Sequence, residues 1–112
     1  MKIEPIDAIA GMRLITPDVF SDHRGTYVET WNDRDWDLRN AAGTPIQFVQ
    51  DDVSLSRAGV LRGLHGDWVT WKLVHCDMGW VWFAAVDLRK DSPTFGKHGI
   101  SAMGPLLPTE AD

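Results

Sequence analysis

The stretch Gly59–Asp87, GVLRGLHGDWVTWKLVHCDMGWVWFAAVD, combines the densest apolar content of the chain with several reactive side chains. Its pattern predicts two strands closed by a short loop, followed by an almost wholly apolar third strand over residues 81–86. If the first two strands pair around residues 66–71, His65 and Lys72 face each other across the hairpin, roughly 5 Å apart. The stretch therefore predicts a β fold with a polar pair at one hairpin end.

The parity of this hairpin decides which other side chains share its face. With His65 opposite Lys72, the rest of that face is apolar. Arg62 falls on the opposite face unless a β-bulge at Gly63 turns it inward, and a glycine inside a strand is a common place for a bulge. Parity thus supports the pair and leaves the place of Arg62 conditional on the bulge.

Short strands and turn signals also fill the rest of the chain. Residues 26–31 alternate and are β-branched or aromatic, and the preceding residues 20–25 form a turn-like segment ending in glycine. Asn32 suits the N-cap of one short helix near residues 33–40. Further strands are expected at residues 12–16, 46–53 and 95–102. Many short strands with one helix predict an all-β sandwich or barrel.

The length and charge of the chain limit its class. At 112 residues we expect one domain, over residues 1–103, and an irregular tail over residues 104–112. A net charge of −5 argues against a nucleic-acid partner, which needs a basic face. Any anionic ligand must therefore be held by a local cluster of Arg and Lys.

The single cysteine, Cys76, excludes an internal disulfide and indicates a reducing cytoplasm. Its place in an apolar segment predicts a buried thiol. Acidic residues and a proline precede any apolar run at the N-terminus, so no signal peptide is expected. The longest apolar run, residues 79–86, is too short to span a bilayer, so no membrane partner is expected.

His65 and Lys72 permit two interpretations. In the first, His65 is a histidine at a loop end and Lys72 is a solvated strand residue. In the second, the charge of Lys72 disfavours the imidazolium form and keeps His65 neutral. A neutral imidazole can remove a proton α to a carbonyl while the ammonium stabilises the enolate oxygen. Spacing alone leaves both interpretations open.

A metal site is a competing interpretation of the same stretch. The spacing from Gly59 to His65 and on to position 67 resembles the first motif of the cupin superfamily, whose metal-binding members have a second histidine there. The candidate ligands are His65, Asp67 and His75, a two-His, one-carboxylate set. However, Lys72 stands where a carboxylate ligand would be, and His75 has the wrong strand parity to converge with His65. The pattern therefore favours a site without metal.

Five segments of the chain occur in a characteristic order. They are Phe20-x-Asp-x-Arg-Gly25 with Glu29, Phe48-Val-Gln-Asp-Asp-x-Ser54, Gly59-Val-Leu-Arg-Gly-Leu-His65, Lys72-Leu-Val74, and Val86-Asp-Leu-Arg89 with Ser92-Pro-Thr-Phe-Gly96. The series resembles the dTDP-4-dehydrorhamnose 3,5-epimerase family of cupin-fold enzymes, which serves dTDP-rhamnose biosynthesis and hence cell-surface polysaccharide. The resemblance implies a jelly-roll homodimer that uses no cofactor and acts on a nucleotide-linked 4-keto-6-deoxy sugar.

The resemblance also implies roles for single residues. His65 would be the base that removes the protons at C3 and C5, and Lys72 would stabilise the enolate. Arg62 would lie in the sugar and phosphate site, which requires the bulge at Gly63. The residues that match those holding the nucleotide, some of them reaching into the partner subunit's site, are Phe20, Arg24, Glu29 and Gln50.

Two departures from the family pattern bear directly on the reaction. Gly66-Asp67 follows His65 where many members have an aromatic residue, which leaves open the particular sugar and its stereochemistry. Beyond Gly96 the family carries a second histidine, the tyrosine that returns the proton and the aspartate that orients the base. The one tyrosine here is Tyr27, so we expect an incomplete, C-terminally truncated jelly roll with impaired activity. The alternatives are a 3-epimerase or ketoisomerase on a related sugar nucleotide and a non-catalytic sugar-nucleotide-binding cupin.

Overall fold

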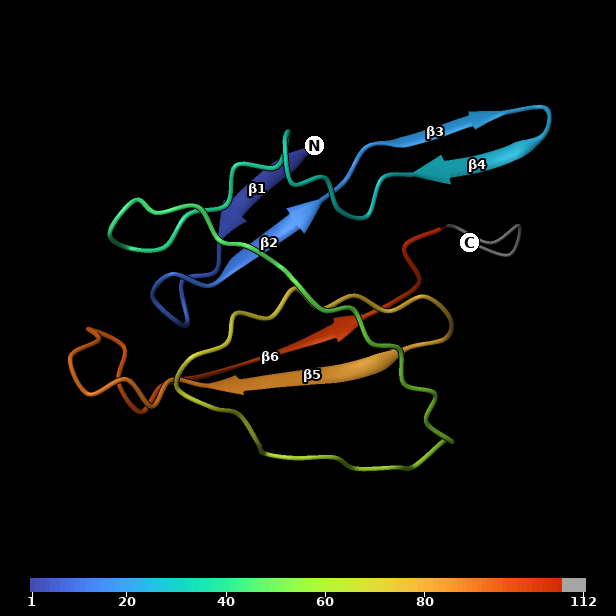
Figure 1. The fold of residues 1–112 in the computed structure, drawn as a ribbon. Helices are drawn as coiled ribbons and strands as arrows, with labels where there is room; N and C mark the ends of the chain where they lie inside the picture. Colours follow the sequence, from blue (N-terminus) through green and yellow to red (C-terminus); the bar gives the residue numbers. More distant parts are fainter. Residues whose placement is uncertain (108–112) are drawn as a thin grey trace. The chain divides into compact units, whose positions relative to one another are not determined.

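The computed structural model describes residues 1–107 and has an all-β fold. Within these residues six short strands pair as three antiparallel two-stranded sheets (Figure 1). The strands are β1 Lys2–Pro5, β2 Arg13–Thr16, β3 Val19–Asp22, β4 Gly25–Val28, β5 Val81–Val86 and β6 His98–Met103. The small antiparallel sheets confirm the predicted all-β class and are consistent with an incomplete cupin-type jelly roll.

The chain divides into two compact units. The strand unit comprises Met1–Asn32 and the described residues from Val74 onward, and it contains all six strands. The loop unit, Asp33–Leu73, contains an isolated bridge between Arg39 and Pro45. The predicted site residues are divided between the units, with Phe20, Arg24 and Glu29 in the strand unit and Gln50, Arg62, His65 and Lys72 in the loop unit.

β3 and β4 form a hairpin whose two-residue turn is closed by Asp22 opposite Gly25. Gly25 has a φ of 134°, a conformation that is open to glycine and rare for other residues. The Asp22 carboxylate accepts the backbone N–H of Arg24 at 2.8 Å. The segment predicted as a turn is therefore strand up to Asp22, because Phe20 pairs with Tyr27 across the ladder.

β5 coincides with the strand predicted from its unbroken apolar run. It pairs with β6 along its whole length, from Val81 opposite Met103 to Val86 opposite His98. Such a run predicts cover on both faces of the strand, yet Trp82 remains 79% exposed. A two-stranded sheet cannot cover its own faces, so burial of this strand would require a further layer.

The helix predicted near residues 33–40 is wrong, since that segment of the described chain has a turn followed by irregular backbone. Trp36 and Leu38 are buried and Asp37 between them is exposed, a period of two that a helix cannot place on one face. The Leu38 carbonyl accepts the N–H of Ile46 at 2.8 Å instead of a helical partner. A short helix rich in aspartate has little stability to oppose these contacts. No helix within residues 1–107 is long and apolar enough to cross a membrane.

Three predicted strands are absent from the described residues. Residues 46–53 and the predicted hairpin over residues 60–75, all of them described, join no strand ladder. Val49 is 90% exposed and Leu61 is 93% exposed, so no neighbouring strand supports either segment. Gly63 itself, with a φ of 103°, belongs to no ladder. The predicted bulge at Gly63 therefore does not form, because the strand that would contain it is absent.

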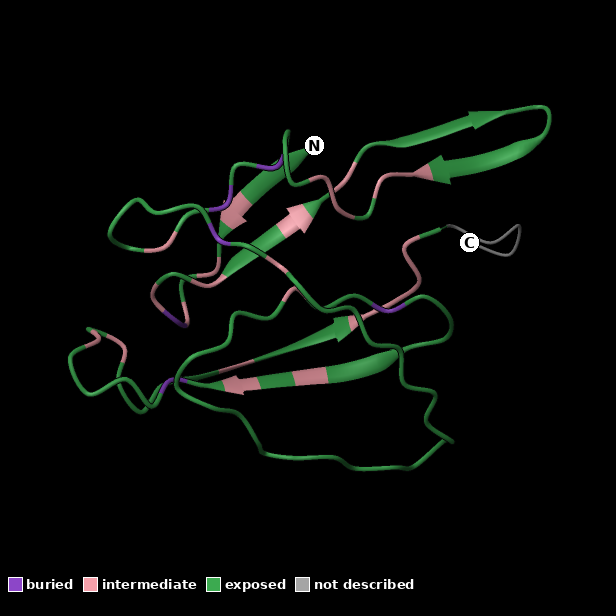
Figure 2. Ribbon diagram, viewed as in Figure 1, coloured by how far each residue is buried: buried purple, intermediate pink, exposed green. Residues whose placement is uncertain are grey.

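Few side chains in the described residues are buried (Figure 2). They are Ile9, Trp36, Leu38, Ile46, Cys76 and Asp87. Cys76 thus has the buried position predicted for it, and its thiol donates a hydrogen bond to the Gly79 carbonyl at 3.4 Å. At the start of the predicted tail, Pro105 forms a bridge with Cys76. Residues 108–112 of that tail lie outside the described residues.

Candidate functional site

The β3–β4 hairpin carries two of the predicted substrate-binding residues. Phe20 lies in β3 opposite Tyr27, both of them largely exposed, and Arg24 occupies the turn. Residues 20–22 and 24–27 line an open hollow of about 570 Å³. Aromatic faces can stack on a flat ring, and a guanidinium can bind phosphate oxygens. The hairpin therefore offers both kinds of contact that a nucleotide requires.

Asp22 orients the Arg24 side chain. The Nη2 and Nε atoms of Arg24 donate to Asp22 Oδ2 at 2.6 and 3.1 Å. The guanidinium lowers the pKa of the Asp22 carboxyl, and the carboxylate in turn raises the pKa of Arg24. A ligand anion at this turn would therefore approach an arginine whose charge is partly offset by its neighbour.

Glu29 and Gln50 each contact a near neighbour in the sequence. Glu29 follows the end of β4, and its carboxylate accepts a hydrogen bond from Asn32 Nδ2 at 3.2 Å. In the loop unit, the Gln50 amide donates to Asp52 Oδ2 at 2.9 Å. Each of these hydrogen bonds joins the side chain to a residue two or three positions away in the sequence.

Arg62 and His65 are exposed residues of the loop unit. Arg62 Nε donates to Ser56 Oγ at 3.0 Å. The His65 ring lies against Gly63, where an added β-carbon would stand 3.5 Å from His65 Nδ1. The positive φ of Gly63 suits glycine. A side chain at position 63 would therefore be in van der Waals contact with the His65 ring, and the bulge predicted to turn Arg62 inward is absent.

A closed turn separates His65 from Lys72. Asp67 Oδ1 accepts the N–H groups of Val69 and Thr70 at 2.9 and 2.7 Å, and Oδ2 accepts the Thr70 hydroxyl at 2.6 Å. The Thr70 hydroxyl, the two N–H groups and the charge of Lys72 together lower the pKa of Asp67 to about 2. Asp67 is therefore ionised at neutral pH and lies within electrostatic reach of Lys72.

The structure places His65 and Lys72 on one exposed loop, and the predicted cross-strand pairing is wrong. The chain between them bends at residues 68–69 and joins no ladder within the described residues. Both side chains are accessible to a ligand. An accessible imidazole can act as a base, and an accessible ammonium can stabilise a developing oxyanion.

The metal-ligand set considered from spacing is not assembled. Within residues 1–107 no three His, Cys, Asp or Glu side chains gather as a metal ion would require. The Asp67 carboxylate is engaged in its turn, and His75 Nδ1 lies 2.8 Å from Asp77 Oδ1. His65, Asp67 and His75 therefore do not form a two-His, one-carboxylate site.

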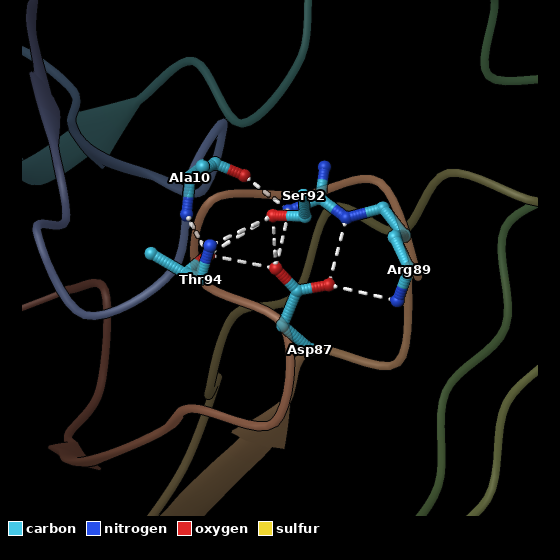
Figure 3. A network of polar contacts seen from close by, with 5 residues as sticks. All are labelled: Ala10, Asp87, Arg89, Ser92 and Thr94. Carbon is cyan, nitrogen blue, oxygen red and sulfur yellow. Dashed lines mark hydrogen bonds and ion pairs between the residues drawn. The ribbon is translucent and has the colours of Figure 1, made fainter.

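Sequence patterns gave no role to a buried carboxylate, Asp87, which directly follows β5 (Figure 3). Asp87 is 3% exposed. Its Oδ1 accepts Arg89 Nε at 2.9 Å, and its Oδ2 accepts the hydroxyls of Ser92 and Thr94 at 2.6 and 2.7 Å. These residues, named here the Asp87 cluster, belong to the last of the five marker segments. The polar residues of that segment are the sequence signal from which a hydrogen-bonded cluster could have been predicted.

The Asp87 cluster reaches the turn between β1 and β2. The Ala10 N–H donates to Thr94 Oγ1 at 2.9 Å, and Arg89 Nη2 donates to the Ala10 carbonyl (Figure 3). Hydrogen bonds from Arg89 and then Ser92 hold the pKa of Asp87 far below its usual range. The cluster therefore joins two connections that are far apart in the sequence.

Comparison with known proteins places these features in a family. A profile of the dTDP-4-dehydrorhamnose 3,5-epimerase family matches residues 7–104. The chain belongs to this family. The matched span includes all seven predicted site residues and the whole Asp87 cluster, so the epimerase-family pattern extends over both units.

Three relatives named dTDP-4-dehydrorhamnose 3,5-epimerase illustrate the similarity. The protein of Pseudomonas aeruginosa is 47% identical over 92 residues, that of Shigella flexneri 45% over 92, and that of Salmonella typhimurium 43% over 93. Each alignment covers 80% of this chain and 50% of the relative. The chain thus spans about half the length of these curated relatives. No solved structure matches it.

Proposed function

We propose that this protein acts on a dTDP-linked 4-keto-6-deoxy sugar in the manner of a dTDP-4-dehydrorhamnose 3,5-epimerase. The family match over residues 7–104 carries the proposal, because that span contains both His65 and Lys72. The net charge of −5 confines recognition of the diphosphate to local cations, and Arg24 and Arg62 are exposed. As the resemblance implies, the protein works without a cofactor, as a homodimer in the cytoplasm.

In the proposed reaction, His65 is the base. A neutral imidazole nitrogen takes the proton from C3 or C5 of the sugar, and the C–H electron pair forms an enolate with the C4 ketone. The Lys72 ammonium stabilises the negative charge that develops on the C4 oxygen. Return of a proton to the opposite face of the carbon restores the ketone with inverted configuration. Both groups are accessible on the exposed loop.

Epimerisation also needs a proton donor on the face of the sugar opposite the base. The 112 residues contain one tyrosine, Tyr27, which lies in β4. If water supplies the proton, the reaction lacks general acid catalysis, which contributes ~10²–10⁴-fold. Solvent exchange is expected to be faster than epimerisation, because His65 can return a solvent-derived proton to the face from which it removed one.

The nucleotide is proposed to bind through the residues that the family resemblance assigns to it. Phe20 and Arg24 line the hairpin hollow, where the ring can stack on the base and the guanidinium can bind phosphate. Glu29 and Gln50 supply a carboxylate and an amide that can accept and donate hydrogen bonds to the base or sugar. Substitution of Phe20 or Arg24 is therefore expected to weaken dTDP binding.

A 3-epimerase or ketoisomerase acting on a related sugar nucleotide is the second candidate. The observation that favours it is Gly66-Asp67 directly after His65, where many family members have an aromatic residue. NMR of the product distinguishes the two, because only a 3,5-epimerase inverts both carbons. A non-catalytic sugar-nucleotide binder would instead bind dTDP and exchange no substrate protons.

Deuterium exchange tests the proposal directly. The chain is incubated in D2O with dTDP-4-keto-6-deoxyglucose, and deuterium at C3 and C5 is followed by NMR. Loss of the base is expected to slow exchange by ~10²-fold or more in His65→Ala. His98→Ala removes another exposed histidine, in β6, and is expected to exchange at the wild-type rate. Equal exchange rates in His65→Ala and the wild type would refute the proposal.

A further inference from the structure

One carboxylate organises the loop between His65 and Lys72. Among residues 63–73, all of them described, every hydrogen bond that forms is accepted by Asp67. The donors are the N–H groups of Val69 and Thr70 and the Thr70 hydroxyl. This segment joins no ladder, so the turn at Asp67 is its main source of local order.

The turn lies symmetrically between the two proposed catalytic side chains. His65 is two residues before Asp67, and Lys72 is two residues after Thr70. Three hydrogen bonds of 2.6 to 2.9 Å close the segment, and two of them come from the backbone. Closure of the turn therefore fixes where the chain to Lys72 emerges relative to the chain that carries His65.

The same carboxylate supplies the negative charge nearest to Lys72 in this loop. The lysine's charge contributes to the lowered pKa of Asp67, so the two groups interact through space. A carboxylate held in a closed turn can restrain the flexible lysine side chain by attraction without burying it. Bonds from N–H and O–H groups to a charged acceptor are stronger than bonds to a neutral one.

We propose that Asp67 is a positioning residue, whose carboxylate closes the turn with Thr70 and thereby places Lys72 relative to His65 for enolate formation. This role deepens the proposed function and rests on it. In this role Asp67 and Thr70 act through the geometry of the loop, and not by contact with the reacting atoms or the nucleotide. In this chain a carboxylate turn takes the place next to His65 where many relatives have an aromatic residue.

Four variants separate the geometry of the turn from its charge. Asp67→Ala removes both. Asp67→Asn removes the charge but keeps a side-chain oxygen that can accept the N–H groups of Val69 and Thr70. Thr70→Val removes only the hydroxyl, and Thr70→Ser restores it. Asp51→Asn is the matched control, because it neutralises another exposed carboxylate of the loop unit.

The measurement is kcat and KM for deuterium incorporation into dTDP-4-keto-6-deoxyglucose. A misplaced catalytic group can cost up to ~10²-fold in rate, so we expect kcat to fall roughly 10- to 100-fold in Asp67→Ala. In Thr70→Val and Asp67→Asn we expect a smaller fall, roughly three- to tenfold. KM should stay within about twofold in every variant, because nucleotide contacts are unchanged. Thr70→Ser and Asp51→Asn should both match the wild type.

His65→Ala, measured in parallel, separates this inference from the proposed function. If His65→Ala exchanges like the wild type, the proposed function fails and the positioning role fails with it. If His65→Ala is inactive while Asp67→Ala and Thr70→Val keep the wild-type kcat, only the positioning role fails. A rise in KM with unchanged kcat would also overturn it, because it would make Asp67 a binding group.

Discussion

Asp87 and Asp67 have similar hydrogen-bonding chemistry in opposite settings. Each carboxylate accepts a threonine hydroxyl and a backbone N–H from a few residues further along the chain. Asp87 is buried, and its partners Arg89 and Thr94 also bond to Ala10, which is 84 residues from Thr94. Asp67 is exposed, and its hydrogen bonds to the described residues all lie within its own turn.

This difference in burial and bonding indicates that Asp87 stabilises the fold, whereas Asp67 shapes the loop of the candidate site. Polar groups in the Asp87 cluster depend on one another, since the buried Asp87 carboxylate loses a partner when any of the others is removed. The Asp67 turn can open without leaving a buried polar group unpaired, because water can replace the hydrogen bonds of the exposed carboxylate. Substitutions in the Asp87 cluster should therefore change stability, and substitutions in the Asp67 turn should change rate.

The largest effect on stability is expected from Asp87→Ala. The change removes the acceptor shared by Arg89, Ser92 and Thr94 and releases the connection between β5 and β6. Thermal unfolding followed by circular dichroism should show a midpoint lower by roughly 10 °C or more. Asp91→Ala removes an exposed carboxylate from the same connection and should leave the midpoint in place. Equal midpoints for the two variants would contradict the role assigned to Asp87.

Thr94→Val should have the next largest effect. The hydroxyl of Thr94 bonds to both Asp87 Oδ2 and the Ala10 N–H, and valine has nearly the same shape. Leaving a partly buried N–H without an acceptor costs about 1–3 kcal/mol. Urea unfolding at pH 7 measures the loss. A loss below about 0.5 kcal/mol, the range of ordinary surface substitutions, would show that the link to Ala10 contributes nothing.

Lowering the pH should reduce the contribution of Asp87 to the free energy of unfolding. The folded-state pKa of Asp87 is lowered from 3.8, so its contribution to stability is fully present above about pH 4. That contribution is lost as the pH falls below 3.8 toward the folded-state pKa. Urea unfolding should therefore show a gap between the wild type and Asp87→Asn that narrows from pH 6 to pH 3. A gap that is constant with pH would contradict this assignment.

The smallest effect on stability is expected from Asp67→Ala, although the same change should lower the exchange rate. The pKa of Asp67 is lowered from 3.8 to about 2, so the stability that its turn gains from ionisation is fully present above about pH 4 and is lost as the pH falls toward 2. Because the carboxylate is exposed, the unfolding midpoint at pH 7 should move by less than about 2 °C. A shift as large as that of Asp87→Ala would erase the distinction between the two regions.

Local sequence signals predicted well where the structure depends on neighbours in the sequence. The apolar run of residues 81–86 is a strand, and Gly25 closes the turn that follows β3. The same signals failed for residues 33–40 and 60–75. In residues 33–40 the hydrogen bond from the Ile46 N–H to the Leu38 carbonyl takes the place of helical bonding. Residues 60–75 form no strand, so the predicted hairpin ladder is absent.

The candidate site was predictable as a set of residues and not as an arrangement. The five ordered segments indicate His65, Lys72 and the nucleotide-binding candidates from residue types and order alone, and the match over residues 7–104 supports the family. Cross-strand pairing of His65 with Lys72 was inferred from parity, which holds only when both segments are strands. The turn at Asp67 takes the place of that pairing.

The sequence by itself determined the family, the all-β class and the residues available for chemistry, because these depend on residue types and their order. Tertiary structure alone decided that Asp87 is buried in a network while Asp67 is exposed in a turn. Both aspartates are followed by hydroxyl residues, so local pattern cannot tell them apart. The difference comes from Ala10, whose N–H and carbonyl reach the Asp87 cluster only once the chain has folded.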